Sequence, residues 1–305
     1  MSAYIVPRSF YTITPPHAPF RGLSCRRFPT NPPHVSGDSD PRCRVDWYPG
    51  GRKRLTRQTQ NYQAVFKRYE KKYLLNRRQY EDLSALLAEH MHEDQFGLHT
   101  VSSVYLDTDS YEIIRESLAK PAYKEKLRLR SYGTPGPHDT VYLELKKKVD
   151  GIVYKRRTDM SLREAERYLR AGIRPARGSS QILSEIDWFM GRRPLRPRVV
   201  ISCDRLALAG DEDPNVRVTF DFNMRWRADH LSLADGSGGA PLISPEYFLM
   251  EVKTAGALPL WLSRFLSEEK IFPTSFSKYG TCYRDHLLKG DEVSCRTKKD
   301  LPYAG

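Results

Sequence analysis

The sequence predicts an α+β fold in which helices pack outside an antiparallel β-sheet. Several segments in the middle of the chain alternate apolar and charged residues with a period of two, as strands with one buried face do. The turn at 134–137 and the hairpin dipeptide Asp150-Gly151 join such segments directly. Segments with helical periodicity of apolar residues lie before and after them, which gives the helices.

Composition limits the class of protein. The 305 residues include 50 Lys and Arg against 37 Asp and Glu, for a net charge of +13. A hydrophobic fraction of 39% excludes a wholly disordered chain. Every apolar run is far shorter than the roughly 20 residues of a membrane span. We therefore expect a soluble protein with a polyanionic partner, namely nucleic acid, anionic lipid or a phosphate-rich molecule.

Cysteine usage favours a reducing compartment. The five cysteines are scattered, and none forms a Cys-x-x-Cys pair. This pattern argues against a zinc site or a disulfide framework, and it favours the cytosol.

Three regions are expected along the chain. Residues 1–60 hold 9 of the 21 prolines and have ten basic residues against three acidic ones. They predict a disordered basic arm. An organelle transit peptide and a start codon assigned too far upstream are the other interpretations of this arm. One ordered domain over 61–290 and a flexible tail over 291–305 follow.

The ordered region begins with a strand and a helix. Residues 64–75 are rich in aromatic and β-branched side chains and predict a strand. Asn76 is a suitable N-cap for a helix through His92. A second strand covers 101–106, and the polar residues that follow it cap a short helix at 111–118.

The remaining elements are predicted in the same way. Strands are expected at 124–132, 141–149, 152–157, 198–208, 216–227 and 247–254. Helices are expected at 162–171, 180–190, 259–270 and 278–288. The glycine-rich stretch 235–239 predicts a flexible loop.

Basic residues are sorted onto one face of successive strands. The pairs at i, i+2 spacing are Arg128/Arg130, Lys146/Lys148 and Lys155/Arg157. A solvated polar face would explain any one of these strands. Repetition is harder to explain in that way, because like charges on neighbouring strands repel and destabilise a sheet. Such a face requires a polyanion to neutralise it.

Closing this sheet into a barrel with its basic face inward would create a positively charged tunnel. Low-dielectric walls would strengthen the binding of a highly charged ligand there. The carboxylates Glu70, Glu144 and Glu251 lie on predicted strands and would point into the same tunnel. Because carboxylate oxygens suit a divalent cation that bridges phosphates, the pattern predicts a metal–polyphosphate site.

Seven short segments in order then give a family resemblance. They are Tyr69-Glu-Lys-Lys-Tyr, Ser103-Val-Tyr-Leu-Asp-Thr, Leu127-Arg-Leu-Arg, Leu143-Glu-Leu-Lys, Val216-Arg-Val-Thr-Phe-Asp, Met250-Glu-Val-Lys and Phe276-Ser-Lys-Tyr. Over about residues 61 to 290 the chain resembles the VTC (vacuolar transporter chaperone) domain. That domain is the polyphosphate polymerase branch of the triphosphate tunnel metalloenzymes, which are CYTH-like.

The resemblance implies a fold and an activity. The fold is an eight-stranded antiparallel β-barrel, the triphosphate tunnel, with helices packed outside. The activity moves the γ-phosphoryl group of ATP onto a growing inorganic polyphosphate chain, with Mn²⁺ or Mg²⁺ as the cofactor.

The resemblance also implies site residues. Catalytic positions are Arg128, Arg130, Lys146, Lys155, Arg205, Arg217, Lys253 and Lys278. The same residues except Lys253, together with Lys72 and Ser277, would bind the triphosphate or polyphosphate. The metal ligand would be Glu251, with Glu70 and Glu144 as further candidates.

One departure from the wider family affects the metal site. The wider family opens with Glu-x-Glu-x-Lys, whereas Arg68 stands here in the place of the first glutamate. This replacement favours the polymerase branch over the triphosphate hydrolases. It also leaves Glu251 as the main metal-ligand candidate.

The charges suggest a mechanism without a general base. Phosphoryl transfer needs positioning and charge neutralisation, and the phosphate acceptor is already anionic. A triphosphatase on the same fold and a non-catalytic binder of polyphosphate, RNA or lipid are the alternatives. The expected partners are ATP, inorganic polyphosphate and a separate membrane protein for translocation, with no nucleic acid. The expected location is cytoplasmic, or peripheral at the inner face of a membrane.

Overall fold

The computed structural model describes residues 69–288 except 151 and 177–179. The chain divides into two units, Met1–Gln63 and Ala64–Gly305, and all described residues belong to the second. The predicted arm 1–60, the start of the predicted strand 64–75 and the tail 291–305 lie outside the described residues.

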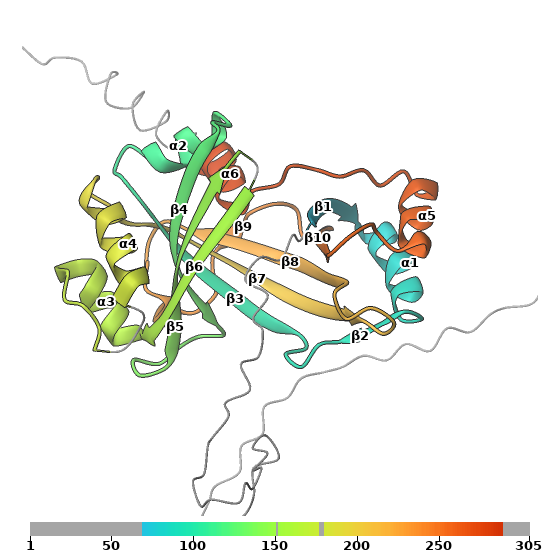
Figure 1. Cartoon of the computed structure of the whole chain (residues 1–305), viewed down its shortest axis with the longest axis horizontal. Coiled ribbons are helices and arrows are strands. Elements are labelled where there is room, and N and C mark those ends of the chain that lie inside the picture. The colour runs from blue at the N-terminus through green and yellow to red at the C-terminus, as the bar shows by residue number, and fades with distance from the viewer. Residues whose placement is uncertain (1–68, 151, 177–179, 289–305) are drawn as a thin grey trace, which may run out of the picture. The chain divides into compact units, whose positions relative to one another are not determined.

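Ten strands and their connecting helices make up the described part of the chain (Figure 1). The strands are β1 (Tyr69–Asn76), β2 (Met91–Glu93), β3 (His99–Asp107), β4 (Tyr123–Tyr132), β5 (Thr140–Val149), β6 (Ile152–Ser161), β7 (Arg196–Gly210), β8 (Arg217–Arg227), β9 (Ala240–Pro241) and β10 (Tyr247–Thr254). The α-helices are α1 (Arg77–Leu87), α2 (Glu112–Leu118), α3 (Leu162–Ala171), α4 (Ser180–Gly191), α5 (Leu260–Glu268) and α6 (Lys278–Cys282). A 3₁₀ turn covers Leu233–Asp235, and a π-helical turn over Tyr283–Leu287 continues α6.

The strands form one antiparallel sheet, which confirms the predicted α+β class. The hydrogen-bonded order is β1-β10-β8-β7-β3-β4-β5-β6, with β2 added to β7 and β9 added to β8. The expected closed barrel differs from this arrangement. Within the described residues, β1 and β6 stand at the two ends of the hydrogen-bonded path, and no ladder joins them. Residues 152–156 of β6 are exposed along that open edge.

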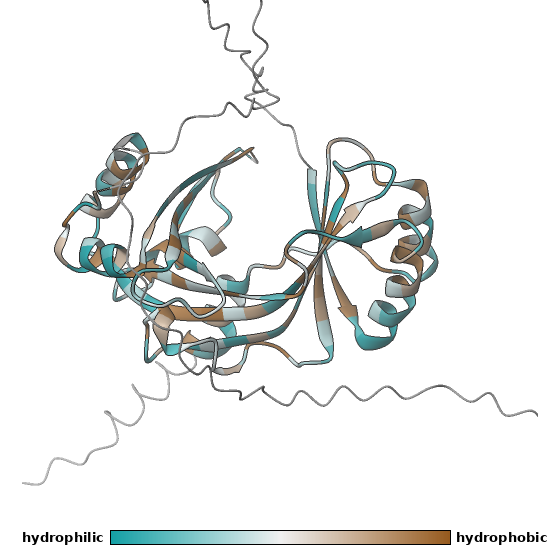
Figure 2. Ribbon diagram, turned by 90° about the horizontal axis from the view of Figure 1, so that it is seen from below, coloured by the Kyte–Doolittle hydropathy of each residue, from teal (hydrophilic) through white to brown (hydrophobic). Residues whose placement is uncertain are grey.

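Helices pack on the outer face of the sheet in two separate groups (Figure 2). α3 and α4 cover β4, β5 and β6, where Leu127, Leu143 and Leu145 are fully buried. α1 and α5 cover β1, β8 and β10 around residues such as Phe220 and Met250. Because each strand has a period of two, burying these residues outward turns their charged neighbours to the opposite face.

We call that opposite side the inner face: the face that carries Arg128, Lys146, Arg205 and Glu251. Part of it is filled by α2 and α6. Tyr279 of α6 stacks on Tyr105 of β3, with ring centroids 4.6 Å apart, and joins a third core with Val199 and Ile201 of β7. The rest of the inner face carries the charged residues.

Local signals in the sequence set several boundaries. Asn76 caps α1 in a capping box with Gln79, and Ser161 does the same for α3 with Glu164. Asp107 caps α2, accepting hydrogen bonds from the amides of Ile113 and Ile114, as the sequence predicted. β5 ends at Val149 and β6 begins at Ile152, as predicted for a hairpin, and Asp150 has a φ of 46°.

Two further predicted features differ from the structure. The helix predicted through His92 ends at Leu87, because Met91 is buried in β2, where it pairs with Gly210 of β7. The stretch predicted as a flexible loop is tied down by Arg227, whose guanidinium donates to the carbonyls of Gly236 and Gly238. In the described part of the chain, no helix has the length and apolar character needed to cross a membrane.

Candidate functional site

Strand register brings the predicted basic residues of β4, β5 and β6 together. Arg128 pairs with Glu144, which pairs in turn with Arg157 on β6. One step along the strands, Lys126, Lys146 and Lys155 form a second cross-strand row. Directly paired residues point to the same side of a sheet, so both rows lie on the inner face.

The other half of the sheet contributes to the same face. Lys72 on β1 pairs with Glu251 on β10, and Glu70 pairs with Lys253. Lys253 pairs with Arg217 on β8, and Arg205 on β7 pairs with Asp221 on β8. The site residues predicted on strands therefore share one continuous face.

The first group of charges is an arginine cluster, which consists of Arg128, Arg130, Glu144, Lys155 and Arg157. Glu144 is 1% exposed and lies 2.7 Å from Arg128 Nη2 and 2.9 Å from Lys155 Nζ. Burial raises the pKa of this carboxyl, but Arg128, Arg130 and Lys155 outweigh burial and lower it to about 2. Glu144 is therefore ionised at neutral pH and holds the cluster together.

Arg130 and Arg157 complete the arginine cluster. Burial and the charge of Arg128 lower the pKa of Arg130, and its Nε donates to Ser103 Oγ at 3.1 Å. Arg157 lies over the Tyr142 ring at 3.6 Å and 3.5 Å from Glu144. The cluster has several cations and one carboxylate, so it keeps an excess of positive charge.

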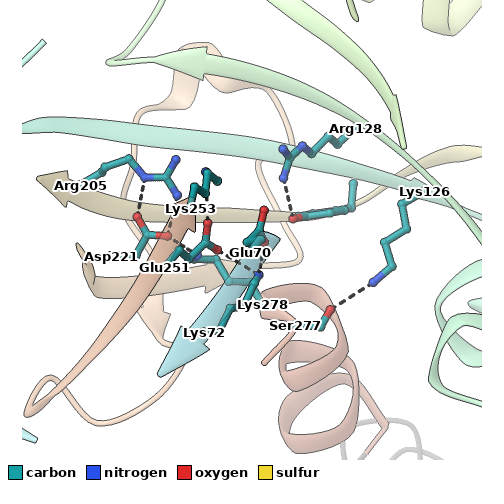
Figure 3. A network of polar contacts seen from close by, with 11 residues as sticks. Glu70, Lys72, Lys126, Arg128, Arg205, Asp221, Glu251, Lys253, Ser277 and Lys278 are labelled. Carbon is teal, nitrogen blue, oxygen red and sulfur yellow. Dashed lines mark hydrogen bonds and ion pairs between the residues drawn. The ribbon is translucent and has the colours of Figure 1, made fainter. Parts of the chain in front are cut away.

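The second group is a carboxylate cluster, which consists of Glu70, Lys72, Glu251 and Lys253. Lys72 Nζ lies 2.9 Å from Glu251 Oε1 and 3.5 Å from Glu70 Oε1, and Lys253 lies 3.7 Å from Glu251 (Figure 3). Burial opposes ionisation of Glu251, but Lys72 and Lys278 hold its pKa well below the usual range. Both glutamates thus share one lysine, and Glu251 is buried.

Asp221 anchors a third set of contacts beside the carboxylate cluster. Its side chain is fully buried and accepts two hydrogen bonds from Arg205, at 2.6 and 2.7 Å. The ammonium of Lys278, the first residue of α6, donates to the same carboxylate (Figure 3). Burial raises the pKa of Asp221, but Lys278 and Arg205 outweigh burial and hold it far below its usual value.

Lys126 joins the two halves of the inner face. Its Nζ donates to Ser277 Oγ at 3.1 Å, which links β4 to the N-cap of α6 (Figure 3). Burial and the charges of Lys146, Lys124, Lys72 and Arg128 lower the pKa of Lys126 to about 8. Burial lowers the pKa of Lys146 on β5, and of the β1 residues Glu70 opposes this shift and Lys72 adds to it. Charges on β1 therefore act on β5 across the inner face.

Most of the predicted site residues contact one another in the structure, but not all of them do. Most belong to the contacts above, whereas Arg217 is exposed and shares the face only through its register with Lys253. The hydroxyl of Ser277 already accepts two hydrogen bonds within the protein, from Gly280 N and from Lys126 Nζ.

Sequence reasoning left three residues out of the site. Asp221 lies between Phe220 and Phe222, and Lys126 precedes Arg128 and Arg130 at the same spacing of two. That spacing could have found Lys126, and the pair Lys155/Arg157 could have found Arg157. No signal distinguishes Asp221 from any other strand carboxylate before the register is known.

A divalent cation would fit only part of the predicted metal set. Among the described residues, no three Asp, Glu, His or Cys side chains gather closely enough to enclose an ion by themselves. Glu251 and Glu70 supply hard oxygen donors near each other, and phosphate oxygens could complete the coordination of a shared ion. Glu144 fits poorly, because it is almost wholly buried and both of its oxygens face cations.

Comparison with known proteins identifies the family. The model of the VTC domain matches residues 67–286. No curated protein matches the chain. Solved structures with a similar chain path include an adenylate cyclase candidate from Bacillus halodurans, with 14% identity, a TM-score of 0.44, and 68% of this chain and 92% of that chain covered.

A second solved structure is an adenylyl cyclase candidate from Hippeastrum that is described as having a dominant triphosphatase activity. It has 13% identity and a TM-score of 0.40, with 71% of this chain and 94% of that chain covered. The family model spans most of the chain and includes every element that builds the inner face. The resemblance seen in the sequence motifs is confirmed, and the chain belongs to the VTC domain family.

Proposed function

We propose that this protein is a polyphosphate polymerase that transfers the γ-phosphoryl group of ATP to the end of an inorganic polyphosphate chain. The observation that carries the proposal is the charge of the inner face. Its carboxylates Glu144, Asp221 and Glu251 are each held by at least two cations. Lys126 and Lys146 form no ion pair with any described carboxylate, so they remain available to a polyanion.

The arginine cluster supports binding of the triphosphate. Arg128 and Arg130 are two residues apart on β4, and guanidinium groups can grip phosphate oxygens through two parallel hydrogen bonds. Lys146 and Lys155 lie opposite each other in the adjacent row. Lys72, Arg205, Arg217, Lys253, Ser277 and Lys278 line the remainder of the proposed substrate path.

Charge compensation is the main chemical contribution that we assign to these residues. A terminal oxygen of the acceptor phosphate forms a bond to Pγ of ATP. The bond from Pγ to the bridging oxygen of the β-phosphate breaks, and its electron pair leaves with ADP. Arg128 and Arg130 would neutralise charge on the transferred group and hold it in line with the acceptor. The acceptor is already ionised, so no side chain has to remove a proton.

We assign the metal position to Glu251, with Glu70 as a second ligand. Mn²⁺ or Mg²⁺ bound there would neutralise phosphate charge and act as a Lewis acid. Lys72 pairs with both carboxylates, and its partly exposed side chain would be available to a phosphate oxygen when they hold an ion.

The closed tunnel is part of the same proposal. Within the described residues no ladder joins β1 to β6, and each of these edges carries a lysine on the inner face, Lys72 on β1 and Lys155 on β6. A polyphosphate bound on that face would attract the cations of both edges. We therefore expect the ends of the sheet to draw together around the chain.

The labelled product of ATP tests the proposed activity. With Mn²⁺ or Mg²⁺, [γ-³²P]ATP is expected to yield labelled polymer that an exopolyphosphatase degrades, and [α-³²P]ATP is expected to leave the polymer unlabelled. The Arg128→Gln/Arg130→Gln variant should lose the polymer signal, whereas Arg163→Gln on the exposed side of α3 should retain it. Labelled orthophosphate as the sole product would assign a triphosphatase. Binding without any turnover would assign a non-catalytic module.

Location and partners follow from the substrate. ATP is cytoplasmic, so we propose that the protein works in the cytoplasm or on the inner face of a membrane. A separate membrane protein would then carry the polyphosphate across. Co-purification of that protein, identified by mass spectrometry, tests this part of the proposal.

A further inference from the structure

A pocket of about 400 Å³ lies where β4 begins and β5 ends. Three lysines line it, Lys120, Lys124 and Lys148, together with Pro121, Ala122, Asp150 and Ser275. The pocket is separate from the arginine cluster, and no residue implied by the family resemblance lines it.

Strand register connects this pocket to the candidate site. Lys124 on β4 pairs directly with Lys148 on β5, and the next row along the strands is Lys126 with Lys146. The row after that is Arg128 with Glu144. Residues i and i+2 on a strand are about 6.8 Å apart, so cations recur at that spacing from the arginine cluster to the pocket.

The lysine rows are not neutralised within the protein. Lys120, Lys124 and Lys148 form no ion pair with a described carboxylate, and Asp150 lines the pocket without approaching them to ion-pair distance. Lys124 donates a hydrogen bond only to the carbonyl of Ser117, at 3.4 Å. Directly opposed like charges destabilise a sheet. The pairs Lys124–Lys148 and Lys126–Lys146 therefore cost the free protein stability, which an anion would restore.

The pKa of Lys124 also indicates that the three lysines of the pocket lie close together. Burial, followed by the charges of Lys148 and Lys120, lowers the pKa of Lys124. The three ammonium groups therefore act on one another, and they converge on one volume. A single phosphate needs fewer cations than the rows provide, whereas a chain of phosphates would contact each row in turn.

We propose that the pocket lined by Lys120, Lys124 and Lys148 is a second anion site, which holds the part of a phosphate chain that extends beyond the arginine cluster. The inference rests on the proposed function for the identity of the chain. It adds the direction in which the chain lies, from Arg128 past Lys126 and Lys146 to the start of β4. It also adds a preference for long chains over a triphosphate.

Equilibrium binding of two ligands tests the second site. Lys120→Gln/Lys124→Gln/Lys148→Gln in the full chain is compared with the wild type, with tripolyphosphate and long-chain polyphosphate as the probes. Because each lost phosphate contact also removes counterion release, we expect long-chain affinity to fall about tenfold or more at low salt. Tripolyphosphate affinity should stay within about twofold, because that ligand fits the arginine cluster alone.

A variant with the same loss of charge elsewhere distinguishes an effect of the pocket lysines from an effect of total charge. Arg163→Gln/Arg167→Gln/Arg170→Gln removes the same charge from exposed positions of α3 and should leave both affinities unchanged. If the triple lysine variant does not fold, Lys120→Gln/Lys148→Gln keeps Lys124 and its bond to Ser117.

Two results would overturn the second site: an equal loss for both ligands, or no loss for either. Neither binding result depends on turnover. A chain-length preference in a protein that makes no polymer would therefore retain the second site and reject the polymerase.

Discussion

Lys72 lies between two carboxylates, 2.9 Å from Glu251 and 3.5 Å from Glu70, on the face of the sheet that carries the cation rows. Under the proposed function, Glu251 would exchange its ion pair with Lys72 for a metal ion. Glu251→Gln is expected to raise the Mn²⁺ midpoint of phosphoryl transfer about tenfold or more, because a proposed metal ligand is lost. A Mn²⁺ titration of activity measures this effect.

The control for Glu251 is Glu246→Gln, which removes an exposed carboxylate that pairs with Arg77. It should leave the Mn²⁺ titration unchanged. If Glu251→Gln weakens ATP binding but keeps the Mn²⁺ midpoint, Glu251 is a counter-ion of Lys72 and not a metal ligand.

Asp221 is expected to be the most important carboxylate for stability. Asp221→Asn would leave Arg205 and Lys278 without their shared counter-charge in a buried position. Loss of one partner from a buried ion pair costs about 3 kcal/mol or more in the free energy of unfolding. Urea unfolding measures the change, and added polyphosphate should recover part of it.

An exposed ion pair provides the comparison for Asp221. Asp109 pairs with Arg196 and Arg198 and is 60% exposed, so Asp109→Asn should cost less than about 1 kcal/mol. Equal losses for the two variants would contradict the anchoring role of Asp221.

Glu144 gives a pH-dependent prediction. Its pKa in the folded protein, about 2, is below the ordinary value of 4.5. A depressed carboxyl pKa contributes stability above the ordinary value, and this contribution is lost as the pH falls toward the folded value. A shift of this size corresponds to about 3 kcal/mol at neutral pH.

Urea unfolding of wild type and Glu144→Gln at several pH values tests that contribution. The difference in free energy should be largest at pH 7 and should shrink as the pH is lowered below about 4.5. Curves that remain parallel across this range would show that Glu144 is not held by the arginine cluster. An unchanged Mn²⁺ titration in Glu144→Gln would also show that it is no metal ligand.

Lys126 is expected to make anion binding sensitive to alkaline pH. With a pKa of about 8, it loses its charge in the free protein as the pH rises, whereas a bound anion would keep it protonated. If binding raises that pKa by about two units, affinity for tripolyphosphate falls about tenfold between pH 7 and 9. The groups that face it are Lys146, Lys124, Lys72 and Arg128, with Ser277 as its hydrogen-bond partner.

Lys126→Arg is the matched variant, because a guanidinium stays charged at pH 9. The ligand itself titrates equally in both experiments, so the comparison isolates Lys126. We expect the decline in affinity to flatten in Lys126→Arg. The same decline in both proteins would assign it to other lysines.

Local order in this fold was predictable because the signals are local. The bounds predicted for the third helix (162–171) and the last strand (247–254) coincide with α3 and β10. The hairpin at Asp150-Gly151 also lies where the sequence placed it. Capping residues, turn dipeptides and period-two alternation act over a few residues, and the sequence shows them directly.

Long-range features were less predictable. The helix expected to reach His92 ends at Leu87 because Met91 pairs with β7, far away in the sequence. Asp221 received no role because its importance comes from Arg205 on the neighbouring strand and Lys278 on α6. Closure of the sheet would require β1 and β6 to meet, and period-two alternation does not show whether two edge strands meet.

The most direct test of the polymerase is the ³¹P NMR spectrum of the full-length protein incubated with ATP and Mg²⁺. The account predicts that internal phosphate signals of a polymer grow as the γ-phosphate of ATP disappears and ADP accumulates. Addition of a polyphosphate primer should increase that growth without producing orthophosphate. ADP and orthophosphate appearing in equal amounts, with no polymer signal, would contradict the account.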